Sequence, residues 1–122
     1  MTNQKFYLEI YGCSANVADG EMMAGLLKEN SLRSVEESGK ADVNIIVTCT
    51  VKTATSHRMM HRIKSLSSSN LPLVVAGCMP KTERSLIENI NPKASLLGPE
   101  DLNRTVETVK AAIKGVRNIH LE

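Results

Sequence analysis

Three cysteines are the side chains of this sequence with the clearest capacity for chemistry. Cys13 lies in "YGCSANVADGEMMAGLL", Cys49 in "NIIVTCTV" and Cys78 in "LVVAGCMP". Each follows a short apolar stretch and precedes a segment with helical spacing. A single cysteine in such a place is most often a small buried apolar residue, but as a thiolate it can bind a metal or act as a nucleophile. Because all three occupy equivalent places and the chain has no other cysteine, a shared site is favoured.

The composition limits the kinds of protein that this chain can be. Its 122 residues suit one domain, and 42% hydrophobic with 23% charged residues is typical of a soluble globular protein. No apolar run reaches membrane-spanning length and the start lacks signal-peptide features, so we expect no membrane partner and a cytoplasmic location. Three widely spaced cysteines are a poor disulfide framework. The net charge of +2 does not by itself indicate nucleic-acid binding.

Strand and helix patterns alternate along the chain. Strands are predicted over residues 5–12, 32–37, 43–48, 71–77 and 94–98, with helices between them and a last helix from Pro99 to Gly115. Asn16 is predicted to be the N-cap of the first helix. The residues predicted to face the core on the successive helices are Met22, Met23, Leu26 and Leu27, then Met59, Met60, Ile63 and Leu66, then Leu86, Ile87 and Ile90, then Leu102, Val106, Val109 and Ile113.

This alternation predicts an α/β fold with three layers. We expect a five-stranded parallel sheet in the flavodoxin-like order 2-1-3-4-5, with helices on both faces. The final two residues, 121–122, are typical of a vector scar, so residues 1–120 are expected to be a domain excised from a longer protein.

The predicted topology brings the cysteines together. Cys13, Cys49 and Cys78 follow the first, third and fourth strands, whose carboxyl ends lie along one edge of a parallel sheet. Helix N-termini at that edge favour negative charge, which suits thiolates around a metal. A zinc site usually takes four protein ligands, often from closely spaced cysteine pairs, and the chain has no CxxC. Three cysteines around one cuboidal iron–sulfur cluster would leave one iron without a protein ligand.

Three blocks of the chain carry a family resemblance. "YGCSANVADGEMMAGLL", "ADVNIIVTCTVKTATSHRMMHRI" and "LVVAGCMPKTE" resemble the cysteine blocks in the N-terminal domain of the radical S-adenosylmethionine methylthiotransferases. Cys-Ser before N-x-x-DGE-x-MAG, together with CTVK and AGC-x-P, is similar to the archaeal and eukaryotic branch. That branch modifies threonylcarbamoyladenosine beside the anticodon of tRNA. The resemblance covers residues 5 to 115.

The resemblance implies a role for the cysteines. Cys13, Cys49 and Cys78 would hold an auxiliary 4Fe-4S cluster whose open iron binds the sulfur to be inserted. A second 4Fe-4S cluster, in a downstream domain with a CxxxCxxC motif, would cleave S-adenosylmethionine to a radical. This sequence contains no such motif, so we expect the isolated chain to be inactive and to work with tRNA through its own downstream radical domain.

Some other polar residues lie near the cysteines in sequence. Asn16, Asp19 and Glu21 are candidates to shape a pocket, although such residues are more often helix caps. Thr50 and Lys52 flank Cys49 and are candidate donors to cluster sulfides. The basic residues of one predicted helix, which form either an RNA-binding face or an ordinary solvated one, are His57, Arg58, His61, Arg62 and Lys64.

Two alternatives from other classes stay open. One is a zinc-stabilised interaction domain in which Cys13, Cys49, Cys78 and a histidine bind the metal. The other is a flavodoxin-like module that binds a nucleotide at the same sheet edge. The absence of a glycine-rich phosphate loop and the few aromatic residues speak against the second.

Overall fold

Strands and helices follow one another along the chain and form three layers. The computed structural model describes residues 4–12, 14–49 and 53–121. The strands are β1 (Lys5–Ile10), β2 (Arg33–Val35), β3 (Val43–Thr48), β4 (Leu73–Gly77), β5 (Ser95–Leu97) and β6 (Ile119–His120). The helices are α1 (Ser14–Glu29), α2 (Thr53–Ser67), α3 (Met79–Thr82), α4 (Arg84–Ile90) and α5 (Thr105–Ile113), with short 3₁₀ helices η1 (Ser38–Lys40) and η2 (Leu102–Arg104).

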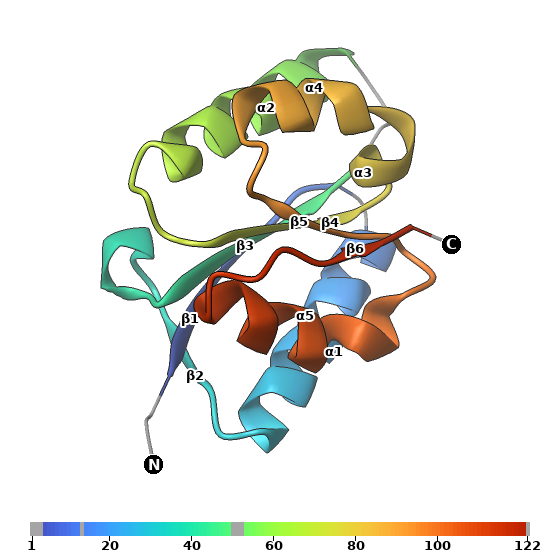
Figure 1. The fold of residues 1–122 in the computed structure, drawn as a ribbon. Helices are drawn as coiled ribbons and strands as arrows, with labels where there is room; N and C mark the ends of the chain where they lie inside the picture. The colour runs from blue at the N-terminus through green and yellow to red at the C-terminus, as the bar shows by residue number, and fades with distance from the viewer. Residues whose placement is uncertain (1–3, 13, 50–52, 122) are drawn as a thin grey trace.

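The sheet is parallel throughout and its strand order is β2-β1-β3-β4-β5-β6. Helices α2, α3 and α4 cover one face, and α1 and α5 cover the other (Figure 1). The α/β class, the layers and the order of the first five strands are therefore confirmed. Among the described residues, no helix combines the length and apolar character needed to cross a membrane.

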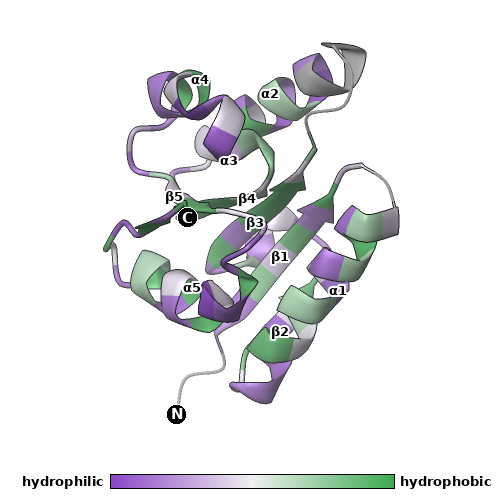
Figure 2. Ribbon diagram, turned by 90° about the vertical axis from the view of Figure 1, so that its right-hand side faces the viewer, coloured by the Kyte–Doolittle hydropathy of each residue, from purple (hydrophilic) through white to green (hydrophobic). Residues whose placement is uncertain are grey.

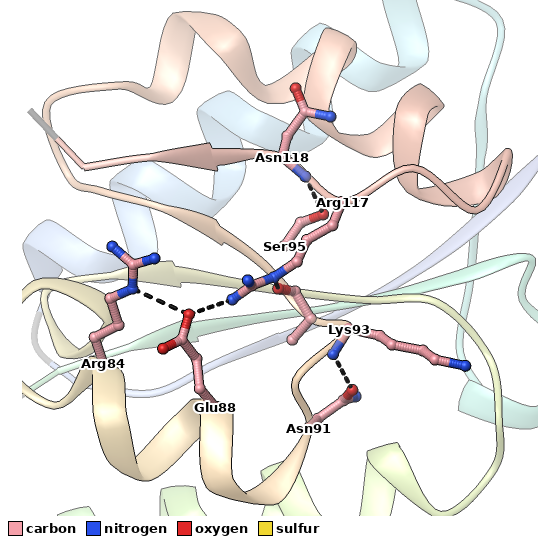
Figure 3. A network of polar contacts seen from close by, with 8 residues as sticks. Arg84, Glu88, Asn91, Lys93, Ser95, Arg117 and Asn118 are labelled. Carbon is pink, nitrogen blue, oxygen red and sulfur yellow. Dashed lines mark hydrogen bonds and ion pairs between the residues drawn. The ribbon is translucent and has the colours of Figure 1, made fainter.

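The predicted number of strands was wrong, because β6 adds a sixth at the edge beside β5. This strand has only two residues, too few to produce an alternating pattern. Polar contacts just before it hold it in place. The Arg117 guanidinium donates to the Ala94 carbonyl at 2.6 Å and to Glu88 at 2.6 Å, and the Asn118 N–H donates to the Ser95 hydroxyl at 3.1 Å (Figure 3).

Apolar residues fill both sides of the sheet. All six residues of β3 and all five of β4 are buried, which explains why both strands are rich in apolar residues. Hydrophobic residues are concentrated on β3, β4 and β5 in the middle layer (Figure 2). Phe6, Met23 and Leu27 belong to the core on the α1 side, whereas Met59, Ile63 and Ile87 belong to the core on the α2 side.

Several predictions about helix faces and ends are corrected by the structure. Met22 and Leu86 are 48% and 47% exposed, because each lies one position from the buried Met23 or Ile87 and is turned aside by the helix. Asn16 is not an N-cap, since it lies inside α1 and is buried. The last α-helix begins at Thr105 and not at Pro99, because the chain first forms η2.

Candidate functional site

Cys49 and Cys78 lie at the same edge of the sheet. Thr48 and Gly77 are the last paired residues of β3 and β4, and one cysteine follows each of them. Both are free thiols; Cys49 is buried and Cys78 is half-buried. Two of the three predicted ligands are thus brought to the carboxyl ends of neighbouring strands, and their role as ligands stays a prediction.

Cys13 lies outside the described residues, but the end of β1 beside it is described. The Tyr11 N–H donates to the Val47 carbonyl at 2.9 Å, so β1 and β3 still run side by side there. A Cβ atom placed on Gly12 would come within 2.8 Å of the Cys49 Cβ. Glycine is needed at this position because its φ of +113° is rarely adopted by other residues and no side chain would fit. The chain that leads into Cys13 therefore passes directly beside Cys49.

Thr48 joins the ends of β3 and β4 by its side chain as well as its backbone. Its hydroxyl donates to the Ala76 carbonyl at 2.7 Å and accepts from the Met79 N–H at 3.2 Å. Its carbonyl accepts from the Cys78 N–H at 3.4 Å. Thr48 is fully buried. The two segments that carry Cys49 and Cys78 are consequently hydrogen-bonded to each other up to the cysteines themselves.

Two further side chains hold the backbone around Cys49. The Asn16 side-chain amide donates to the Thr48 carbonyl at 3.0 Å, which ties the first turn of α1 to the end of β3. The Cys49 N–H donates to the Met59 Sδ at 3.2 Å, which ties the same segment to α2. Asn16 was predicted to shape the pocket or to cap a helix, and the structure gives it this backbone contact. Asp19 is half-buried and Glu21 is exposed.

A polar cluster links β1 to α2 near this edge. Glu9 accepts hydrogen bonds from Tyr7 at 2.7 Å and from Tyr11 at 2.6 Å. Arg62 donates to both Glu9 oxygens, each at 2.8 Å. Burial acts to raise the pKa of Glu9, but the hydrogen bonds from Arg62, Tyr11 and Tyr7 outweigh it and hold this pKa at about 2. Burial and the bond to Glu9 raise the pKa of Tyr11 to about 12.

The predicted basic face of α2 has one exposed residue fewer, because Arg62 belongs to this cluster. Arg62 is half-buried against Glu9, so the prediction that it belongs to an exposed face was wrong. His57, Arg58, His61 and Lys64 are exposed, and none of them has an ion-pair partner in the part of the chain that the structure describes. Helix α2 contains no acidic residue. Its solvent face is therefore basic.

Other predicted site residues receive no test from the structure. Thr50 and Lys52 lie outside the described residues. Within residues 4–12, 14–49 and 53–121, no three His, Cys, Asp or Glu side chains form a group that could hold a metal, and Cys13 is not among them. Sequence reasoning missed Thr48 and the acceptor role of Met59. A threonine at the end of a mostly apolar strand, directly before a cysteine, was the available signal.

Comparison with known proteins identifies the family. Residues 5–98 match the family described as "Uncharacterized protein family UPF0004". The chain belongs to the UPF0004 family. The family match includes the ends of β1, β3 and β4 and therefore all three cysteines.

Several relatives of this UPF0004 chain share the name of one enzyme. The chain is 42% identical over 120 residues to the "Probable threonylcarbamoyladenosine tRNA methylthiotransferase" of Methanothermobacter thermautotrophicus, with 95% of the chain and 28% of the relative covered. It is 35% identical to the "Threonylcarbamoyladenosine tRNA methylthiotransferase" of Danio rerio and 33% identical to that of Homo sapiens, each over 92% of the chain and 20% and 19% of the relative. The resemblance to the archaeal and eukaryotic branch is confirmed, and the chain spans under a third of these relatives' length.

Proposed function

We propose that this chain is the iron–sulfur-binding N-terminal domain of a tRNA methylthiotransferase that adds a methylthio group to threonylcarbamoyladenosine. The observation that supports this most is the place of the free thiols. Cys49 and Cys78 directly follow neighbouring strands at one sheet edge, in a UPF0004 chain with relatives that are named as such enzymes. The whole enzyme would need S-adenosylmethionine, a second cluster and further domains, and a cytoplasmic location goes with this proposal.

The residues at the edge suit a 4Fe-4S cluster by their chemistry. Such clusters are held by cysteine thiolates, and neither Cys49 nor Cys78 is used in a disulfide. Cys13, Cys49 and Cys78 would be the ligands. When bound, the cluster would offer an iron without a protein ligand, at which the sulfur for transfer can be held.

The surrounding residues would shield and orient this group. Cys49 is only 4% exposed, so water is largely excluded on its side, whereas the half-buried Cys78 leaves an approach from solvent. Met59 uses its sulfur to accept the Cys49 N–H, and Asn16 holds the preceding carbonyl. The backbone at Cys49 is therefore fixed from two helices, and its thiol has little freedom to move away from a bound cluster.

The solvent face of α2 supports tRNA as the partner. Met59 contacts the backbone of Cys49, and His57 and Arg58 lie within one helical turn of Met59. Cations without ion-pair partners can neutralise RNA phosphates. We expect Arg58→Glu in the full-length enzyme to weaken tRNA binding several-fold. The slope of the logarithm of the binding constant against the logarithm of the salt concentration should become shallower by about one. Lys110→Glu on α5, with the same charge change on the other side of the sheet, should leave both unchanged.

The proposal as a whole is tested by a paired assay in a full-length enzyme that contains this chain. For Cys13→Ala, Cys49→Ala and Cys78→Ala, formation of the methylthio nucleoside should be lost while release of deoxyadenosine from S-adenosylmethionine stays measurable. Wild-type nucleoside formation in all three variants would contradict the proposal. Tightly bound zinc with four protein ligands in aerobically purified protein would instead favour the alternative of a zinc-stabilised interaction domain.

A further inference from the structure

We propose that Thr48 is a positioning residue that fixes the two thiols Cys49 and Cys78 relative to each other. The inference rests on the proposed function only for the identity of the group that the thiols hold. Thr48 is joined to Cys49 by the peptide bond and to the Cys78 segment by hydrogen bonds from both its side chain and its backbone.

The hydroxyl of Thr48 acts where the sheet itself ends. The last regular pair of β3 and β4 is Thr48 with Gly77, and the next residues on both strands are the cysteines. Beyond that pair, the Met79 N–H is bonded to the Thr48 hydroxyl and the Cys78 N–H to the Thr48 carbonyl. A backbone N–H buried without a partner is costly, so this arrangement resists any shift of Cys78 away from β3.

Close packing supports the same role. Gly77 has a φ of +101°, and a Cβ atom placed there would collide with the Thr48 carbonyl oxygen and lie 2.9 Å from its backbone nitrogen. The two strands therefore touch by their backbones at this point. Gly77, which precedes Cys78, is therefore in backbone contact with Thr48, which precedes Cys49. The hydrogen bonds of the Thr48 hydroxyl then set the direction in which the chain leaves β4 at Cys78.

An isosteric substitution separates the hydroxyl from the shape of the side chain. Thr48→Val keeps the β-branched form and removes both hydroxyl hydrogen bonds, whereas Thr48→Ser keeps the hydroxyl. Thr108 provides the matched control, because it is equally buried and its hydroxyl has no hydrogen-bond partner within the described part of the chain. Thr108→Val thus makes the same chemical change in α5, away from the cysteines.

The readout uses the thiols without any cluster. In a Cys13→Ser background the reduced 122-residue chain is titrated with Cd²⁺, and the thiolate-to-Cd²⁺ charge-transfer band reports binding by Cys49 and Cys78. Thr48→Val should bind Cd²⁺ on the order of tenfold more weakly, the factor that corresponds to about 1.4 kcal/mol. Thr48→Ser should restore binding to within about threefold, and Thr108→Val should bind like the parent chain. Circular dichroism checks that each variant is folded.

Two results would overturn the proposal. The first is a folded Thr48→Val chain that binds Cd²⁺ as tightly as its parent; the second is a Thr48→Ser chain as weak as Thr48→Val. If Thr48→Val does not fold, amide hydrogen exchange of the unmutated chain decides: the Met79 N–H should be strongly protected, and free exchange would refute the contact. A wild-type chain that binds Cd²⁺ in this way but takes up no iron would contradict the proposed function and leave the role of Thr48 standing.

Discussion

Replacing Glu9 by glutamine tests the cluster that joins β1 to α2. The Glu9 side chain is 14% exposed and its partner Arg62 is 32% exposed, so solvent screens this pair little. The pKa of Glu9 falls from 4.5 to about 2 in the folded protein. This shift corresponds to about 3 kcal/mol of stability at neutral pH, as an upper value. We expect Glu9→Gln to lower the free energy of unfolding by about 2 to 3 kcal/mol at pH 7.

The pH dependence of this loss follows from the sign of the shift. Because the folded pKa is lower than the unfolded one, the stabilisation by Glu9 is complete above about pH 5 and is lost as the pH falls toward 2. Urea unfolding of both chains should therefore show a difference that is more than about 1 kcal/mol smaller at pH 3.5 than at pH 7.

A matched ion pair provides the control for Glu9. Glu37 lies 3.6 Å from Lys40, and both side chains are about 70% exposed. Glu37→Gln should change the free energy of unfolding by no more than about 0.5 kcal/mol at either pH. Equal losses for Glu9→Gln at pH 7 and pH 3.5, or a loss no larger than that of Glu37→Gln, would show that the ionised Glu9 does not stabilise the fold.

Three other predictions follow from burial and backbone geometry. Gly77→Ala should cost more than about 2 kcal/mol in urea unfolding, because its Cβ would collide with the neighbouring strand at a positive φ; a loss under about 0.5 kcal/mol would contradict this. Met23→Ala should lower the free energy of unfolding by about 2 to 5 kcal/mol and Met22→Ala by less than about 0.5 kcal/mol. Equal losses would contradict the assignment of Met23 to the core face of α1. In the native chain iodoacetamide should modify Cys78 faster than Cys49, and equal rates would contradict their different burial.

The sheet could be predicted because its central strands have a strong signal in sequence. β3 and β4 consist mostly of buried apolar residues, since both faces of these strands are covered by helices. Parallel pairing then requires crossover helices, and the chain has helical stripes in the right places. The common edge of Cys49 and Cys78 follows from this topology alone.

Contacts between side chains that are distant in sequence could not be predicted in the same way. Glu9 and Arg62 look like surface charges in their own elements, and only the packing of α2 beside β1 pairs them. The Thr48 hydroxyl and Met59 sulfur acquire their partners only when two or three segments meet. Hydrophobic periodicity and secondary-structure propensity contain no information on contacts between elements, because both describe one element at a time.

Iron and sulfide counting on the anaerobically reconstituted chain shows whether its three cysteines hold a 4Fe-4S cluster. We expect about four iron and four sulfide per wild-type chain, and a clear loss of both in each of Cys13→Ala, Cys49→Ala and Cys78→Ala. A wild-type chain that takes up no iron under these conditions, or single-cysteine variants that all keep the wild-type content, would contradict it.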